Sequence, residues 1–105
     1  MPAYIVCTMT VSDQATYLKY TALTPATLAR YQGKFLTRGD PVSTLEGREF
    51  AERMVILEFP DRATAAAWYA DADYQTASAF RRAASKGAMW LQEGTANTAN
   101  PDPKV

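Results

Sequence analysis

Two arginines are the residues best suited to bind an anion in this sequence. Arg38 ends a short, mostly apolar segment, and its guanidinium stays charged at any working pH and fits a carboxylate or a phosphate. We expect Arg38 to hold an anionic ligand, with Arg81 as a second contact. The alternatives are an internal ion pair of Arg38 with Glu46 or Glu58, and a role for Arg81 in satisfying carbonyl groups at a helix end.

Glu58 and Glu46 are the candidate general bases. Glu58 alternates with Met54 and Ile56 in an expected strand, so its side chain should point to a sheet face that is otherwise apolar. Desolvation there would raise the pKa of the carboxyl group and suit it to proton abstraction from a carbon acid or a phenol. Glu46 precedes Gly47 and could act in the same way. The alternatives are an interface ion pair for Glu58 and a solvated carboxylate for Glu46.

Aromatic residues form a third group of candidates. They are expected to line a pocket for a flat organic molecule, with hydroxyl groups that orient it: Tyr17, Tyr20, Trp68, Tyr69 and Tyr74. Tyr74 and Arg81 are seven positions apart and would share one helical face. The alternative is that these aromatic side chains are ordinary core. Cys7 is expected to be a buried, inert thiol.

The chain contains no histidine. This composition excludes a Ser-His-Asp triad, a histidine-activated thiol, an axial haem histidine and every metal site built on imidazole. A magnesium or calcium site made of carboxylates alone would need clustered aspartates, and no such spacing suggests one. We therefore expect no metal and no cofactor.

Length and charge limit the classes of partner. The 105 residues fit one domain, and 48% hydrophobic residues suffice for a modest core. Basic and acidic residues number 11 each, without a run of either sign, so neither nucleic acid nor a membrane surface is expected as a partner. The longest uncharged apolar run, residues 3–9, is too short to cross a bilayer, and no signal peptide is recognisable. A single cysteine agrees with a cytoplasmic location.

The apolar pattern predicts the element order β-α-β-β-α-β. Strands are expected at 3–11, 34–38 with a continuation over 42–46, 53–59 and 88–93. Helical segments are expected at 13–31, 63–72 and 74–85. The helix caps should be Ser12-Asp13, Pro60-Asp61 and Asp73, with a kink or break near Pro25. Gly33 should end the first helix as its C′ residue, and Lys86-Gly87 should end the last one. Residues 1–94 would form the domain, and residues 95–105 a disordered or loosely attached tail.

The expected sheet is apolar on both faces. Val55, Leu57 and Phe59 would face the helices. Met54 and Ile56 make the other face apolar as well, whereas a solvated face would carry charges at alternate positions. Soluble monomers rarely expose such a patch, and a second copy would cover it while burying on the order of 1,600 Å² in total. We therefore expect a homodimer of an α+β protein with a four-stranded sheet.

Five short motifs occur in a recognisable order. They are YQGKFLTRG at 31–39, LEG at 45–47, VILEFP at 55–60, AWY at 67–69 and YQ at 74–75, followed by Arg81. Over about residues 2–94 the chain resembles a bacterial family of small proteins known as a domain of unknown function, within the dimeric α+β barrel superfamily. Gln32 departs from the family, in which a second glycine is more frequent, and this concerns only the local turn.

The resemblance implies a ferredoxin-like fold with a four-stranded antiparallel sheet, paired face to face in a homodimer. Relatives in the superfamily include antibiotic-biosynthesis-type monooxygenases, muconolactone-isomerase-like enzymes and dye-decolourising peroxidases. Most of the small relatives place a pocket between the helices and the sheet. The family itself has no assigned activity.

Three functions fit these observations. The first is a cofactor-independent isomerase or monooxygenase-like enzyme for a small aromatic or carboxylated metabolite, with Glu58 or Glu46 as base and Arg38 or Arg81 stabilising the anion. The second is a module that binds the same ligand without chemistry. The third is a structural dimer whose motifs hold the interface.

Overall fold

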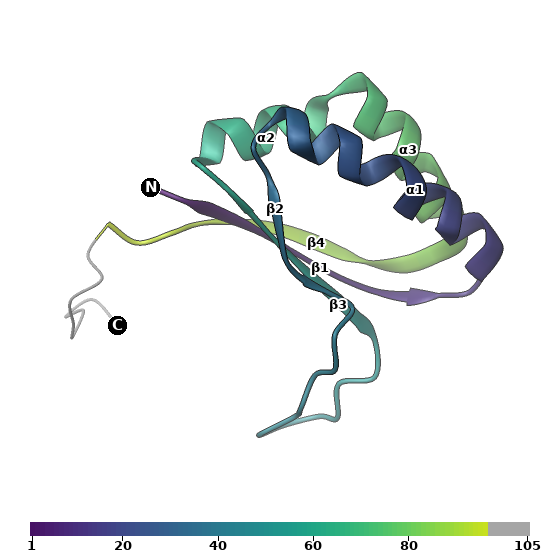
Figure 1. Cartoon of the computed structure of the whole chain (residues 1–105). Helices are drawn as coiled ribbons and strands as arrows, with labels where there is room; N and C mark the ends of the chain where they lie inside the picture. Colours follow the sequence, from purple (N-terminus) through teal and green to yellow (C-terminus); the bar gives the residue numbers. More distant parts are fainter. Residues whose placement is uncertain (97–105) are drawn as a thin grey trace.

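The computed structural model describes residues 1–96. Its elements follow the chain as β1 (Ala3–Val11), α1 (Gln14–Arg30), β2 (Lys34–Arg38), β3 (Arg53–Phe59), α2 (Arg62–Ala70), α3 (Ala72–Ala84) and β4 (Ser85–Glu93). The strands form an antiparallel sheet in the order β2-β3-β1-β4, and the helices lie together on one side of it (Figure 1). This is the expected ferredoxin-like α+β arrangement.

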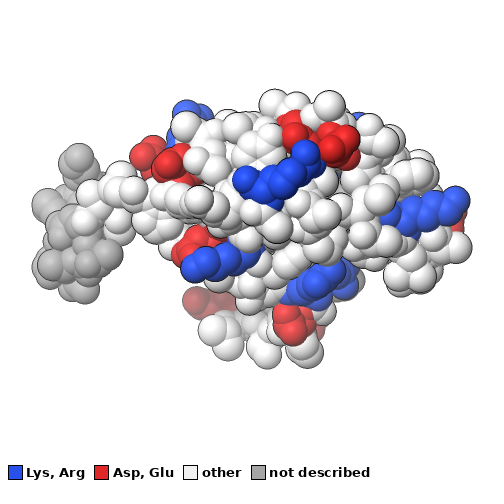
Figure 2. All heavy atoms as spheres, turned by 45° about the horizontal axis from the view of Figure 1, so that its top comes forward, with Lys and Arg blue, Asp and Glu red and all other residues white. Residues whose placement is uncertain are grey.

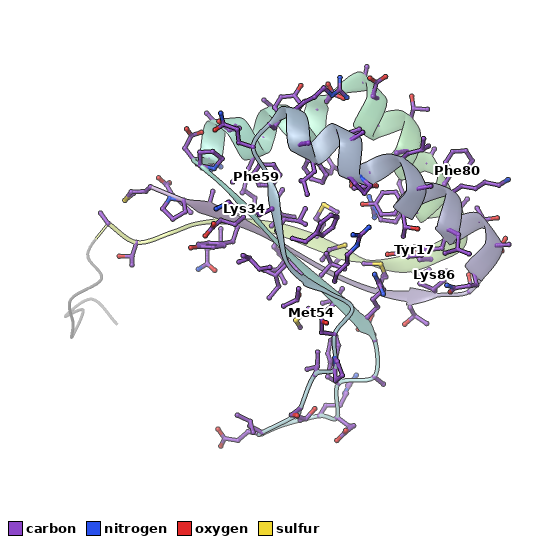
Figure 3. All side chains as sticks on the ribbon, viewed as in Figure 1. Tyr17, Lys34, Met54, Phe59, Phe80 and Lys86 are labelled. Carbon is purple, nitrogen blue, oxygen red and sulfur yellow. The ribbon has the colours of Figure 1, made fainter. Side chains whose placement is uncertain are left out.

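The two faces of the sheet differ sharply in burial. We call the side under the helices the covered face, and it includes the buried β1 residues Ile5, Cys7 and Met9. The other side, the open face, carries the alternate residues, among them Val6 opposite Ile56 and Trp90. Figure 3 shows Tyr17 and Phe59 between the helices and the sheet, with Met54 on the far side. The alternation in the sequence predicts this division correctly.

The first helix begins where the sequence predicts. Asp13 is its N-cap, with a side chain that accepts a hydrogen bond from the Thr16 N–H at 3.2 Å. Of the expected kink or break near Pro25, the break is not observed, because α1 runs on to Arg30. Proline removes a single backbone donor, and the face formed by Tyr17, Tyr20 and Leu28 stays buried on both sides of it.

The end of α1 corrects the expected role of Gly33. Gln32 occupies the left-handed position, with φ 58°, and its N–H donates to the Ala29 carbonyl at 3.2 Å. The Gly33 N–H donates to the Leu28 carbonyl at 3.0 Å, which completes a Schellman motif. Gly33 follows Gln32, and a glycine is needed there because a Cβ at position 33 would collide with the side chains of Leu28 and Phe59.

Three other expected boundaries also shift. Asp61 caps α2 as predicted, but Asp71 rather than Asp73 caps α3. Lys86 and Gly87 belong to β4, which starts at Ser85, because Gly87 is required by close contact with the backbone of β1 and not by a turn. Residues 42–46 form no strand. Residues 97–105, most of the expected tail, lie outside the described residues.

Two broader expectations can be compared with the described chain. Within residues 1–96, no helix is long and apolar enough to span a bilayer. On the face of the molecule turned toward the viewer in Figure 2, basic and acidic side chains are interspersed, without a large patch of one sign.

Candidate functional site

A narrow cavity lies between α1 and the covered face of the sheet. Its walls come from α1 and from all four strands: Cys7, Met9, Tyr17, Tyr20, Thr21, Thr24, Phe35, Arg38, Arg53, Val55, Leu57 and Met89. The enclosed volume is about 30 Å³, which is room for about two water molecules. Among these lining residues the only charged side chains are the two arginines, and no carboxylate is present.

A β-bulge turns Arg38 toward this cavity. In the register of β2 with β3, Phe35 lies opposite Leu57, Thr37 opposite Ile56 and Arg38 opposite Val55, with an irregularity between Phe35 and Thr37. The extra residue brings Arg38 back to the covered face, where its guanidinium carbon lies 4.2 Å from the centre of the Phe35 ring. The predicted anion contact is therefore part of the cavity wall.

Arg53 is the second cation of the cavity. It pairs with Met9 at the start of β3 and so lies on the covered face, with its guanidinium carbon 5.6 Å from the centre of the Tyr17 ring. Its Nε is buried and has no hydrogen-bond partner among the described residues. Gly39 packs against the same guanidinium, since a Cβ at position 39 would collide with it. Leaving such a donor unpaired is unfavourable.

Arg81 lies behind the cavity wall. Its guanidinium carbon is 5.8 Å from the centre of the Tyr20 ring, and its Nε is likewise buried without a partner in the described chain. Tyr20 separates it from the cavity, and Arg81 is absent from the lining. The structure thus brings Arg38 and Arg53 together and places Arg81 in the layer behind them.

Tyr17 and Tyr20 in the cavity wall, and Tyr74 behind them, are neutral hydrogen-bonding groups. The hydroxyl oxygens of Tyr20 and Tyr74 are 3.0 Å apart, and the Tyr17 hydroxyl donates to the Met9 sulfur at 3.1 Å. Burial raises the pKa of Tyr17, Tyr20 and Tyr74, and the neighbouring Tyr74 raises that of Tyr20 further. Burial also raises the pKa of the Cys7 thiol, which Arg81 and Arg53 only partly offset. The predicted buried cysteine is confirmed.

The other aromatic candidates do not line the cavity. Trp68 and Tyr74 are fully buried, with ring centres 3.9 Å apart, and the Trp68 indole N–H donates to the Thr27 hydroxyl at 3.1 Å. These contacts are the ordinary core that the sequence left as an alternative. Tyr69 is 42% exposed and borders a separate apolar hollow beside β4, together with Trp90.

Neither carboxylate candidate reaches the cavity. Glu58 lies on the open face as predicted, opposite Tyr4, and its Oε1 is 3.8 Å from the Lys34 ammonium. Partial desolvation and the neighbouring Glu58 raise the pKa of Tyr4. Arg38 and Glu58 lie on opposite faces, so the alternative pairing between them is not formed. Glu46 is exposed in the segment between β2 and β3.

Sequence reasoning missed Arg53. The signal was present, because Arg53 continues the alternation of Val55, Leu57 and Phe59 toward the covered face. An arginine in line with three core residues at the start of a strand is a candidate for a buried cation. Across residues 1–96, no three Cys, Asp or Glu side chains are close enough to hold a metal ion.

The fold and this cavity define a small ferredoxin-like α+β protein with a cationic, otherwise apolar cavity under its first helix. The model of the family described as "Domain of unknown function (DUF1330)" matches residues 2–95, and the chain belongs to this family. The resemblance noted in the motifs is thereby confirmed. No protein with curated annotation matches the sequence significantly.

Solved structures share the fold at low sequence identity. The crystal structure of RPA0582, a protein of unknown function from Rhodopseudomonas palustris, has a TM-score of 0.74 at 18% identity, covering 91% of this chain and 84% of that one. SnoaB, a cofactor-independent oxygenase from Streptomyces nogalater, has a TM-score of 0.60 at 18% identity, covering 96% and 98%. Rv0793 from Mycobacterium tuberculosis has a TM-score of 0.57 at 9% identity, covering 94% and 100%.

Proposed function

We propose that this protein binds a small anionic metabolite with a flat apolar body in the cavity between α1 and the sheet. The observation that supports this most directly is the buried, unpartnered Nε of Arg53 in a wall that contains Arg38 and no carboxylate. Charge-assisted hydrogen bonds from guanidinium groups are strong, and a low local dielectric strengthens them further. A carboxylate or a phenolate is therefore the fitting partner.

The ligand enters by displacing Arg38. Ligand cavities usually measure about 300–1,000 Å³, far more than this one encloses. Arg38 is exposed on the edge strand β2, where its side chain rests on the Phe35 ring. Outward rotation of this side chain would open the cavity toward Tyr17 and Tyr20, whose hydroxyl groups then orient the ligand.

The test uses benzoate as an anionic probe and benzamide as its neutral isostere. Saturation-transfer NMR and isothermal titration should show benzoate binding at least tenfold more tightly than benzamide. The variant Arg53→Met should abolish this preference, whereas Arg62→Met, an exposed arginine on α2, should keep it. Equal binding of both probes to the native protein would refute an anion site.

A second candidate function is cofactor-independent oxygenation in the same cavity. SnoaB, with the same fold, is described as such an oxygenase. In this reaction an acidic aromatic substrate first loses a proton to water. The resulting carbanion or phenolate gives one electron to dioxygen, and the radical pair combines to a peroxide anion, which takes a proton back from water and then loses water to leave a carbonyl group. Arg53 and the neutral Tyr20 hydroxyl would stabilise the substrate anion.

Oxygen uptake distinguishes catalysis from binding alone. We expect an oxygen electrode to record uptake with easily oxidised phenols or anthrones, and Arg53→Met to reduce it about tenfold or more. Glu58→Gln should leave the rate unchanged, because Glu58 lies on the other face of the sheet. Ligand binding without uptake would instead favour the non-catalytic alternative.

We further propose that the chain forms a homodimer through the open face. Val6, Ile56 and Trp90 meet at its centre, and Trp90 is 55% exposed although it is the largest side chain there. Sedimentation equilibrium at micromolar concentration should give twice the chain mass. Ile56→Asp should give monomers, whereas Leu18→Asp, on the exposed side of α1, should leave the dimer intact.

A cytoplasmic location is the corresponding cellular proposal. Cys7 is the only cysteine in the sequence, and it is buried, so the fold needs no oxidising compartment. Cell fractionation with compartment markers tests this directly, and recovery outside the cytoplasm would contradict it.

A further inference from the structure

The segment between β2 and β3, residues 39–52, projects from the sheet on the side of the open face, away from the helices (Figure 1). We call this segment the arm. It contains neither helix nor strand, yet Leu45 within it is 92% exposed and Val42 is 40% exposed. Among the described residues, no other large hydrophobic side chain is as exposed as Leu45. In an isolated subunit the Leu45 side chain would remain exposed to water, and this exposure adds nothing to the stability of the subunit.

Local hydrogen bonds give the arm a defined shape. The Gly39 N–H donates to the Met54 carbonyl at 3.0 Å, which fixes its base on β3. The Phe50 N–H donates to the Thr44 hydroxyl at 2.8 Å, and this hydrogen bond links the outgoing and returning halves of the arm. Gly47, with φ 88°, supplies the left-handed turn near its tip. The position of Leu45 is therefore set by the backbone around it.

We infer that the arm grips a second copy of this chain, with Leu45 seated in the apolar hollow beside β4 of that copy. This inference rests on the dimer proposed above. Stable interfaces bury about 800 Å² of accessible surface per partner, so a segment beside the open face that also packs on the second copy adds to what the sheet alone can bury. The arm extends from the edge of the sheet toward the side where the second copy would lie.

The hollow beside β4 suits a leucine side chain. It measures about 390 Å³ and lies between β4 and α2, on the helix side of the sheet edge. Its walls carry no charged residue and consist of Ile5, Ala65, Ala66, the exposed Tyr69, Met89, Trp90 and Leu91. If two sheets pack face to face about an axis along their strands, β2 of one copy lies over β4 of the other. The arm starts at the end of β2, so this arrangement brings it to the β4 edge of the partner, and there it would pass around the edge strand so that Leu45 enters the hollow on the helix side. Both apolar surfaces would then be covered at once.

The first test measures the dimer dissociation constant by sedimentation equilibrium. Leu45→Asp should weaken the dimer at least tenfold, and Ala66→Trp, which fills the hollow, should have a similar effect. Leu18→Asp, a 54% exposed leucine on α1, is the matched control and should leave the constant unchanged. Thermal unfolding of each variant confirms that it is folded.

The second test locates the contact. A benzophenone amino acid at position 45 should, on irradiation, form a cross-link to a β4 or α2 peptide of a mass-labelled second copy. Two outcomes would overturn the role of the arm but not the dimer. One is a dimer dissociation constant that is the same for the native protein and Leu45→Asp, and the other is cross-links confined to one chain or to another surface. A native protein that stays monomeric at all concentrations would instead refute the dimer itself.

Discussion

Phe35 and Arg38 lie on the same face of the sheet, although strict alternation along β2 would put them on opposite faces. The bulge places Leu36 and Thr37 together opposite Ile56, and the Thr37 hydroxyl accepts the Ile56 N–H at 3.0 Å. One extra residue in an edge strand thus decides whether the cavity has its outer cation.

Arg38→Met should remove the outer cation from the cavity. We expect benzoate binding to weaken about 10- to 100-fold, the effect of losing one charge-assisted hydrogen bond. Deletion of Leu36 is the control for titration calorimetry: it takes out only the extra residue, so Phe35, Thr37 and Arg38 alternate regularly and Arg38 stays on the covered face. Unchanged binding by Arg38→Met would show that Arg38 does not contact the anion.

Gly39→Ala should disturb both stability and binding. Gly39 has φ 80°, and a Cβ there would also meet the Arg53 guanidinium. Gly47→Ala is a matched control, since Gly47 has φ 88° but open space around it. We expect each variant to lose roughly 1 kcal/mol from the backbone strain, and only Gly39→Ala to lose benzoate binding as well. Urea unfolding and titration separate the two effects.

Arg53→Met should leave the fold as stable as the native protein or more stable. The buried Nε has no partner, so an apolar side chain of similar length removes an unfavourable desolvation of about 1–3 kcal/mol. The loss of the contact between Arg53 and the Tyr17 ring opposes this gain. Urea unfolding provides the measurement. A large destabilisation would mean that Arg53 is a structural residue and not a ligand contact.

Asp71 should control stability in acid. Its carboxylate accepts hydrogen bonds from the Tyr31 hydroxyl at 2.8 Å and from the Tyr74 N–H at 3.0 Å, and these bonds, with the charge of Arg30, hold the pKa of Asp71 below the ordinary value. Because the pKa of Asp71 is lower in the folded protein, its carboxylate contributes fully to the free energy of unfolding above about pH 4, where the unfolded group ionises. This contribution is lost as the pH falls through the folded pKa.

Asp71→Asn keeps a cap acceptor and Asp71→Ala does not. Thermal unfolding near neutral pH should rank the native protein first, Asp71→Asn second and Asp71→Ala last. Below about pH 4 the difference between the native protein and Asp71→Asn should shrink. A constant difference down to the lowest pH at which the protein folds would show that the charge of Asp71 plays no part.

The buried tyrosines should make the protein sensitive to alkali. Unfolded tyrosine ionises near pH 10, whereas burial raises the folded pKa of Tyr20 and Tyr74 above that value. The neutral tyrosines therefore contribute fully to the free energy of unfolding below about pH 10, and this contribution falls as the pH rises further. Tyr74→Phe should reduce that slope by up to about 1.4 kcal/mol per pH unit. Tyrosinate absorbance reports ionisation, and circular dichroism reports unfolding. Ionisation of these tyrosines at a lower pH than unfolding would contradict the prediction.

The sequence by itself determined the fold. Alternation in β1 and β3 predicts the division into a covered and an open face, because side chains of a strand point alternately to its two sides. The caps at Asp13 and Asp61 are equally local, since each depends on a hydrogen bond to a residue three positions away. These features need no knowledge of distant residues.

The cavity was decided by tertiary structure. A bulge is fixed by the pairing of two strands, so nothing in β2 alone shows that Arg38 joins Phe35. The same holds for two glycines. A side chain at Gly87 would collide with β1, and one at Gly33 would collide with Phe59, which is distant in the sequence. The sequence left a pair of Arg38 with Glu58 open as an alternative, and the sheet separates these two residues. A site made from α1 and four strands exists only after long-range packing has set which side chains meet.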